Sequence, residues 1–400
     1  MQFNFYCRKY IIFLFVVFVH QLQSQSIKKV LDKLPDTGQS KSYTDTLGED
    51  SDYTINAPEL IDNLDGTITD KITGLMWQKV DGGEMTHSSA LQYADSLTLG
   101  SFTDWRLPIA FEIYSIQNLQ VNNPALNTTY FTKSNAEYWW TSDLQVNDNS
   151  RVWVSNAGGG IGNHLKSETI SAGGTKRYHA RVVRNIKENI SLQKRFEVID
   201  DDVVVDSLTG LMWQRKISNN PMTWENALAF SEQLSLGNYN DWRLPNIKEL
   251  HSIHMVKEFM PCLDRIAFPL ADIRKLWSST TQNNQATRAW YFDSNFGITT
   301  QEAKSTALYV LCVRSTSIVN ANTVLQSEKI KYKIYPNPTS NTVSILIKEP
   351  LQIMVSDVAG KIYITKYLTE ENNSIDLSTA PNGILFLKFP DGQKYKLVKE

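Results

Sequence analysis

The stretch Thr73-Gly74-Leu75-Met76-Trp77-Gln78 occurs twice in this chain, returning as Thr209-Gly210-Leu211-Met212-Trp213-Gln214. Downstream, Asp104-Trp105-Arg106-Leu107-Pro108 returns as Asp241-Trp242-Arg243-Leu244-Pro245, at nearly the same spacing. Solenoid repeats are about 20–50 residues long, so a repeat of this much greater length indicates two copies of a whole domain.

Length and composition fit three folded units. The 400 residues predict about two or three domains at roughly 100–200 residues each. A content of 42% hydrophobic and 11% aromatic residues is enough for a core in each. We expect the first copy at residues 58–185, the second at residues 196–316 and a third unit at residues 332–400, with linkers at residues 186–195 and 317–331. The net charge of −2 excludes a strong overall attraction to nucleic acid or to an anionic membrane.

Residues 1–25 are typical of an export signal. Two basic residues precede an apolar run from Ile11 to Val19, which is shorter than the about 20 residues that span a bilayer. Because no later segment is apolar enough to cross a membrane, we expect an exported mature protein without a transmembrane segment. Residues 26–57 are polar and poorly patterned, and we interpret them as a linker.

Each copy is expected to begin with a hairpin and two helices. Asp65-Gly66 between two short extended runs predicts a tight turn. A calcium loop is disfavoured here, because Ile61 stands where the first carboxylate ligand is needed. The spacing of Trp224, Ala227 and Leu228 predicts a helix with one buried face. A second helix follows each Arg-Leu-Pro, where proline suits the first turn.

Eight residues of the repeated stretches are predicted to be structural: Trp77, Trp105, Arg106, Glu112, Trp213, Trp242, Arg243 and Glu249. The tryptophans lie among apolar residues, and we interpret them as core. The two Arg–Glu pairs are predicted to be ion pairs that hold the second helix of each copy, in preference to catalytic groups.

The later part of each copy has the pattern of short strands. Helices early and a sheet late favour an α+β fold for both copies. The third unit shows short alternating strands with turns at intervals of about 8–12 residues, which predicts a small all-β sandwich.

The repeated stretches, together with Trp277-Ser278-Ser279-Thr280 and Cys312-Val313-Arg314, resemble the Lcl C-terminal domain family of collagen-like bacterial adhesins. This resemblance implies an exported or surface-displayed domain, and some relatives bind host glycosaminoglycans. Arg-Leu-Pro followed by a helical Glu is also similar to C-type-lectin-like folds, including the formylglycine-generating enzymes. The two resemblances together imply tandem C-type-lectin-like modules.

Three motifs near the C-terminus resemble the sorting domain of type IX secretion systems: Tyr335-Pro336-Asn337-Pro338, Asp357-Val358-Ala359-Gly360-Lys361 and Pro381-Asn382-Gly383-Ile384. The resemblance implies that residues 332–400 engage the type IX secretion machinery and are then removed. Together with the export signal, it predicts a protein that is secreted or held on the outer-membrane surface.

Cysteines and histidines offer few chemical candidates. Cys262 and Cys312 both lie in the second copy and both lack a cysteine counterpart in the first, which predicts a disulfide in an oxidising compartment. A redox or copper-binding pair is the alternative. His251, His254 and Glu258 share a helical spacing that suits metal ligands, but we favour a surface helix. No nucleophile motif is present, and we assign no catalytic residue, metal or cofactor.

The sequence indicates one ligand surface, made of Trp139, Trp140, Arg151, Arg177 and Arg181. Adjacent residues of a strand point to opposite faces, so one of the two neighbouring tryptophans should be exposed and able to stack on a sugar. Arg177 and Arg181 belong to a basic segment from Lys176 to Arg195, which we interpret as a strand edge and linker, with contact to an anionic glycan as the alternative. Arg151 and the glycine-rich loop Gly158-Gly159-Gly160 complete the predicted surface.

The hypothesis is therefore an exported surface protein that binds polysaccharide, or another host or environmental polymer, without catalysis. Pairing two modules in one chain would raise avidity. The alternatives are an enzyme of the formylglycine-generating or carbohydrate-active type and a purely structural envelope protein.

Overall fold

The computed structural model describes residues 27–168, 177–192, 194–269, 272–315, 333–336, 338–347, 349–358, 360–369, 372–390 and 394–400. The predicted export signal at residues 1–25 and the predicted linker at residues 317–331 lie outside the described residues. Asn337 and Ala359 of the sorting-domain motifs lie outside them as well. Within the described part of the chain, no helix has the length and apolarity needed to span a bilayer.

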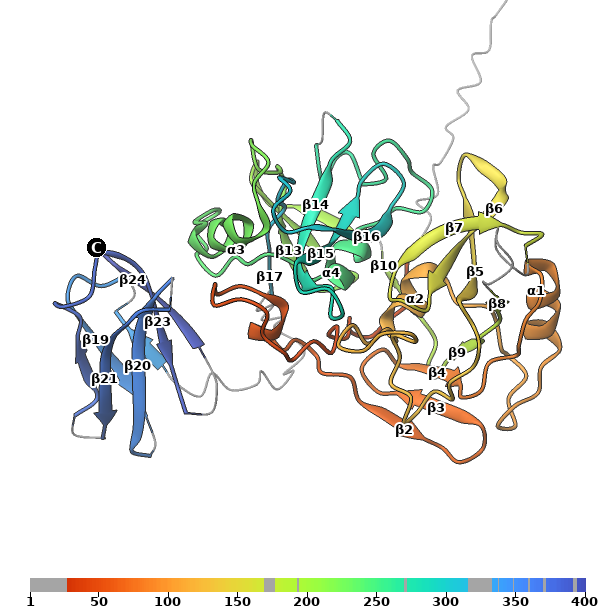
Figure 1. Ribbon diagram of the computed structural model, residues 1–400, viewed down its shortest axis with the longest axis horizontal. Helices are drawn as coiled ribbons and strands as arrows, with labels where there is room; N and C mark the ends of the chain where they lie inside the picture. The colour runs from red at the N-terminus through yellow and green to blue at the C-terminus, as the bar shows by residue number, and fades with distance from the viewer. Residues whose placement is uncertain are drawn as a thin grey trace, which may run out of the picture.

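The first module contains a four-stranded sheet, two helices and most of the strands of a second sheet (Figure 1). Its elements are β2 (Leu60–Asp62), β3 (Thr67–Asp70), β4 (Leu75–Gln78), α1 (His87–Ser96), α2 (Ala110–Ser115), β5 (Tyr138–Gln145), β6 (Asp148–Asn156), β7 (Ile161–Leu165), β8 (Tyr178–His179) and β9 (Val183–Asn185). The small sheet has the order β2-β3-β4-β9, and the turn at Asp65-Gly66 joins its first two strands.

The second module repeats this plan. Its elements are β11 (Phe196–Val198), β12 (Val203–Asp206), β13 (Leu211–Gln214), α3 (Trp224–Gln233), α4 (Ile247–Ser252), β14 (Lys275–Thr281), β15 (Arg288–Asp293), β16 (Ile298–Ala303) and β17 (Val313–Ser315). The small sheet has the order β11-β12-β13-β17, which matches the small sheet of the first module strand for strand.

The predicted α+β class is wrong, and so is the C-type-lectin-like assignment of the modules. Among the described residues, 24 strands stand against four α-helices, and the longest helices have ten residues. The helices begin where the sequence predicts them, but each is too short to form a layer. Hydrogen-bonded strand ladders, and not helix packing, therefore organise both modules.

One sheet of seven strands joins the two modules. Its order is β14-β15-β16-β7-β6-β5-β8. Strand β16 of the second module pairs with β7 of the first, so both are inner strands of the combined sheet. The join is antiparallel, with Thr299 of β16 opposite Ile161 of β7. In Figure 1 these two strands lie near the centre of the modular part of the molecule. We call this join the module seam.

A single core runs through both modules. Trp77 pairs across the sheet with Val183, and Trp213 pairs with Val313, so the two tryptophans have equivalent surroundings. Both indoles are fully buried and belong to the same apolar cluster. Each module adds a smaller cluster of its own around the tryptophan of its Asp-Trp-Arg-Leu-Pro stretch. Truncating one such buried tryptophan to alanine is expected to cost about 3–5 kcal/mol.

The segment before the first module is packed and is not a solvated linker. Residues 27–57 hold β1 (Ile27–Lys29), which pairs with β10 (Ile190–Leu192), and a single 3₁₀ turn at Asp50–Asp52. The Gln39 side chain exchanges two hydrogen bonds with the Thr281 backbone, at 2.9 and 3.0 Å. These polar contacts bind the segment to the second module, although the first module is the one that follows the segment in the chain.

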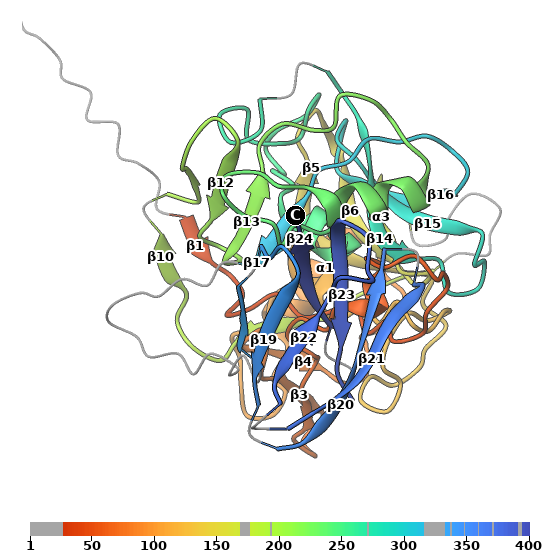
Figure 2. The same cartoon turned by 90° about the vertical axis from the view of Figure 1, so that its left-hand side faces the viewer.

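The C-terminal domain has a core of its own. Its strands are β18 (Lys333–Tyr335), β19 (Thr342–Leu346), β20 (Leu351–Asp357), β21 (Ile362–Leu368), β22 (Ser374–Asp376), β23 (Gly383–Lys388) and β24 (Lys394–Lys399). They form sheets of order β18-β19-β22 and β21-β20-β23-β24, which enclose an apolar cluster separate from those of the modules. The domain stands at the left of Figure 1 and in the foreground of Figure 2.

Candidate functional site

A groove of about 300 Å³ opens at the module seam. Small-molecule pockets have volumes of about 300–1,000 Å³, so the groove is large enough for a ligand. Both modules line it, with residues from the end of β6, the following turn and β7 on one side, and residues from β15 and β16 on the other. Its lining residues are Asn122, Tyr138, Asn156, Gly158, Gly160, Ile161, Gly162, His164, Gln282, Trp290, Ile298, Thr299, Thr300 and Gln301.

Glycines allow the close approach of the two modules here. Gly159 has φ of 101°, and a Cβ at this position would lie 2.5 Å from Leu119 of the same module and 3.4 Å from Trp290 across the seam. A Cβ at Gly160 would lie 3.1 Å from the carbonyl oxygen of Thr299 across the seam. The Ile161 amide donates to the Thr299 hydroxyl at 2.8 Å. The glycine-rich turn at residues 158–160 therefore shapes the seam.

Gly162 differs from these neighbours. A Cβ at this position would meet no heavy atom within 4 Å, so a side chain here would extend into open space on the groove wall. The position therefore allows the groove to be filled without disturbing the core.

The predicted ligand surface does not form. Trp139 and Trp140 are 2% and 0% exposed, so the expectation that one of them is exposed is wrong. Their strand lies inside the seven-stranded sheet, and both of its faces are covered. Arg151 lies 3.4 Å from Asp148, and Arg177 lies 2.7 Å from Glu84. These two arginines are half exposed, but each is paired with a carboxylate.

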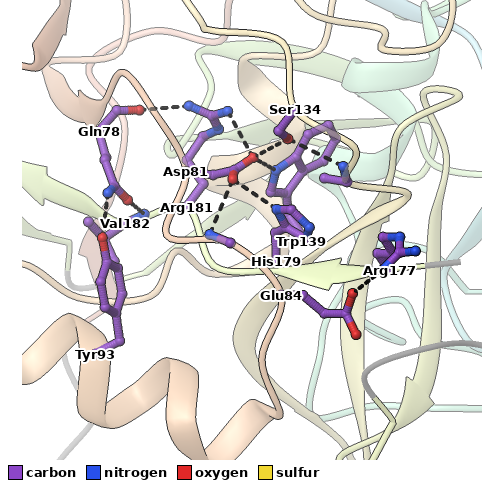
Figure 3. Close-up of polar contacts among 12 residues, drawn as sticks. Gln78, Asp81, Glu84, Tyr93, Ser134, Trp139, Arg177, His179, Arg181 and Val182 are labelled. Carbon is purple, nitrogen blue, oxygen red and sulfur yellow. Dashed lines mark hydrogen bonds and ion pairs between the residues drawn. The ribbon is translucent and has the colours of Figure 1, made fainter.

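The fifth member of that surface, Arg181, is fully buried in the polar network shown in Figure 3. Its guanidinium donates to the carbonyl oxygens of Gln78 and Lys79 at 2.7 and 2.8 Å, and lies 3.5 Å from Asp81. His179 Nδ1 lies 2.8 Å from the same carboxylate. Burial lowers the pKa of Arg181 to about 10, and the negative charge of Asp81 opposes that shift. The guanidinium therefore stays charged at neutral pH.

Asp81 is the centre of this network. Its carboxylate also accepts hydrogen bonds from Ser134 at 2.5 Å and from the Trp139 indole at 3.2 Å. Burial alone would raise the pKa of Asp81, but the hydrogen bond with His179 and the charge of Arg181 outweigh burial and hold it well below its usual value. The serine bonds to the aspartate and not to the histidine, so this is no nucleophile–base pair of the hydrolase type.

The second module has apolar or aromatic side chains at the equivalent positions. The Gly82 amide donates to Ala180 and the Ser218 amide donates to Val310, both at 2.8 Å, which aligns the two modules residue by residue. In this alignment Asp81, Trp139, His179 and Arg181 correspond to Ile217, Leu276, Tyr309 and Leu311. Asp81, Ser134 and His179 lie far apart in the sequence and form no motif, so none of them was predicted as a site residue. Comparing the two copies position by position would have shown the substitution.

The Arg–Glu pair predicted for each module forms an ion pair in the structure. Arg106 donates twice to Glu112, at 2.6 Å each, and Arg243 donates to Glu249 at 2.7 and 2.6 Å. Each glutamate also accepts from the backbone N–H at the start of its own helix, at 2.9 Å. The neighbouring Trp105 and Trp242 are 4% and 1% exposed. These residues hold the fold and do not line the groove.

The predicted disulfide is absent. Cys262 and Cys312 are free buried thiols in different apolar clusters. In the first module Ala125 follows Pro124 as Cys262 follows Pro261, and the Val182 carbonyl accepts from Gln78 as that of Cys312 accepts from Gln214. These two counterparts are also fully buried, so both cysteines fill small apolar positions. Burial raises the pKa of the Cys312 thiol to about 12 and raises that of Cys262 further. Neither thiol is activated, which leaves the redox or copper-binding alternative without support.

His251 and His254 are buried at the seam, so the predicted surface helix is wrong at these positions. The His251 ring lies 4.9 Å from Tyr114, and the His254 ring lies 4.9 Å from Trp153, in both cases edge to face. Both contacts cross from one module to the other. Within the described residues, no three His, Cys, Asp or Glu side chains are grouped so as to hold a metal ion.

A second cavity, of about 480 Å³, lies within the second module alone. Its lining includes the apolar side chains of Ile217, Met222, Phe230 and Leu236. In the first module Tyr93 has the helix position that Phe230 has in the second, and its hydroxyl accepts a hydrogen bond from Gln78 at 2.6 Å. The seam groove is the better candidate site, because both modules contribute polar side chains to it.

Two family models match the chain. The Lcl C-terminal domain model matches residues 66–184 and 202–314, and the secretion system C-terminal sorting domain model matches residues 333–400. The resemblances to the Lcl C-terminal domain family and to the type IX sorting domain are thereby confirmed. No curated protein matches the chain.

Two solved structures show weak likeness. One is PorZ, described as an essential bacterial surface component of the type-IX secretion system of Porphyromonas gingivalis; it is 14% identical, over 66% of this chain and 30% of that chain, with a TM-score of 0.16. The other is dimeric latent PorU from Porphyromonas gingivalis, 11% identical over 62% of this chain and 26% of that chain, with a TM-score of 0.13. The chain thus spans under a third of either protein, and these scores do not establish a common fold.

Proposed function

Because the chain belongs to the Lcl C-terminal domain family and is exported by type IX secretion, we propose that it binds an extracellular polysaccharide in the seam groove. The sorting domain at residues 333–400 engages the type IX machinery, and the protein reaches the cell surface or the medium. Binding at the seam is the part that we propose.

One observation carries the proposal: the groove crosses the seam, so two modules build one site. A ligand that is longer than one sugar unit could contact both walls at once. Because β16 and β7 belong to one hydrogen-bonded sheet, the walls are held in place before the ligand arrives. Such preorganisation reduces the entropic cost of binding.

The alternatives have less support. A formylglycine-generating type of enzyme would need an accessible cysteine pair, whereas both thiols are buried in separate clusters. The buried Asp81 network has its serine bonded to the carboxylate, so it does not favour a hydrolase. A purely structural role would not require a polar groove shared by both modules.

A glycan array probed with the purified protein tests the proposal. We expect enrichment on at least one polysaccharide, and a loss of at least about tenfold in affinity for Gly162→Trp, because the indole would fill the open groove. Asn149→Ala is the matched control, since Asn149 is exposed at the other end of β6. Equal binding by the wild type and Gly162→Trp would place the ligand elsewhere, and enrichment on no polymer would contradict the proposal.

A further inference from the structure

Resting on the proposed function, we infer that the seam groove selects an uncharged glycan and excludes acidic polymers such as sulfated or uronic-acid chains. The groove has polar walls on both sides of the seam, yet Asp, Glu, Lys and Arg are absent from its described lining. Recognition of a sulfate or carboxylate group normally uses Arg or Lys as a charged donor.

The arginines closest in sequence to the lining are occupied by the protein itself. Arg151 lies against Asp148 at 3.4 Å and reaches Asn163 at 3.5 Å. Arg288 donates to the carbonyl oxygen of Gln301 at 2.6 Å. Turning either side chain toward a ligand would break a contact that it already makes. The groove therefore has no free positive charge to offer among these residues.

The histidine of the lining is also engaged. His164 Nδ1 lies 2.6 Å from the Tyr178 hydroxyl and 3.3 Å from Glu168. A carboxylate this close would repel an acidic polymer at this end of the groove. The same carboxylate would not repel an uncharged polymer.

Amide and hydroxyl groups are the chemistry that the walls do present. Asn156, Gln282, Thr300 and Gln301 are half-buried, and Asn and Gln side chains both donate and accept hydrogen bonds. A sugar hydroxyl also does both, so amide-rich walls complement a neutral glycan. The carbonyl oxygen of the Gln282 side chain is buried and has no hydrogen-bond partner among the described residues. A ligand hydroxyl would satisfy it.

Ring stacking contributes little to this site. Trp290 and Tyr138 line the groove but are 3% and 7% exposed, so little ring surface is open to a ligand. Affinity should therefore depend on hydrogen bonds and hardly at all on ionic strength, because screening by salt acts on charges.

Retention on immobilised polymers tests the inference. Mannan, xylan and laminarin are the neutral probes, and heparin and alginate are the acidic ones, each at about 0.05 and 0.5 M NaCl, where the screening lengths differ about threefold. We expect retention on a neutral probe that changes by less than about twofold with salt. Gln282→Ala and Gln301→Ala should each weaken it by about threefold to tenfold through lost hydrogen bonds, while Asn149→Ala leaves it unchanged.

The outcomes separate this inference from the proposed function. Retention on heparin or alginate alone, with release at the higher salt, overturns the selection for neutral glycans but leaves polysaccharide binding standing. Salt-resistant retention on a neutral probe that both Gln variants leave unchanged also overturns it. Retention on no probe contradicts both.

Discussion

The guanidinium of Arg243 donates two hydrogen bonds to the carboxylate of Glu249, at 2.7 and 2.6 Å, in the interior of the second module. The first module has the same bidentate pair between Arg106 and Glu112. The two pairs differ in solvent contact: the Arg243 side chain is 6% exposed and the Arg106 side chain is 37% exposed.

This difference predicts unequal effects of one conservative change. Glu249→Gln leaves a buried guanidinium without its counter-charge, and the loss of one partner of a buried ion pair costs about 3–5 kcal/mol. Glu112→Gln should cost clearly less, because water can solvate Arg106. Each glutamine keeps an oxygen for the helix start, so the two variants are matched. Urea unfolding followed by tryptophan fluorescence measures both, and an equal or larger loss for Glu112→Gln would contradict the explanation.

The Asp81 network predicts a non-additive mutation series. Arg181→Leu alone leaves Asp81 charged and buried without its ion-pair partner, and we expect a loss of about 3–5 kcal/mol of unfolding free energy. Adding Asp81→Ile and His179→Tyr introduces the residues that the second module carries at these positions. This triple variant should recover most of the loss, because an apolar cluster replaces the ion pair.

Thermal unfolding of the single and triple variants provides the comparison. The two modules share the same backbone alignment here, so the second module shows that the apolar set fits the fold. If the triple variant is no more stable than Arg181→Leu, the network has a role that the apolar set cannot replace.

Acid should loosen the module seam. Burial, with a smaller effect of neighbouring His254, lowers the pKa of His251 well below its usual value. Burial, with the nearby charge of Arg195, lowers the pKa of His254 to about 3. The unfolded chain, whose histidines titrate near about 6.5, therefore binds more protons than the folded one at acidic pH. Stability is present above about pH 6.5 and is lost as pH falls from there toward the folded pKa values, by up to about 1.4 kcal/mol per pH unit for each histidine.

A variant isolates this contribution from that of other acidic groups. His254→Phe keeps an aromatic ring beside Trp153 and removes one titrating group. Melting temperatures measured from about pH 8 to pH 4, across the ordinary histidine range, should fall more steeply for the wild type than for the variant. Parallel curves would show that the buried imidazole does not couple folding to pH.

The duplication could be predicted from the sequence because each copy repeats residues that pack at equivalent positions in the core. Trp77 and Trp213, for example, pair with equivalent valines in the small sheets. The fold class could not be predicted in the same way. Helix positions were visible from spacing and from proline, but their share of the fold depends on how the many short strands pair, and pairing is set by contacts that are distant in the chain.

The candidate site was largely hidden for the same reason. Residues of the groove such as Asn156 and Gln301 have no shared motif, and only the pairing of β7 with β16 brings them together. The polar segment before the first module was misread because its polar side chains, such as Gln39, bind another part of the protein instead of water. The prediction that Trp139 or Trp140 is exposed is wrong because both faces of their strand are covered.

The cysteines provide the last prediction. In the chain without residues 1–25, we expect two free thiols after unfolding in guanidinium and almost no reaction with a thiol reagent in the native state, because both thiols are buried with raised pKa values. Cys262→Ala and Cys312→Val introduce the residues of the first module, and each should cost less than about 1.5 kcal/mol. An unfolded, non-reduced sample with no free thiol would show that the two cysteines are bonded after all. A much larger cost for either variant would show that these positions need sulfur for more than packing.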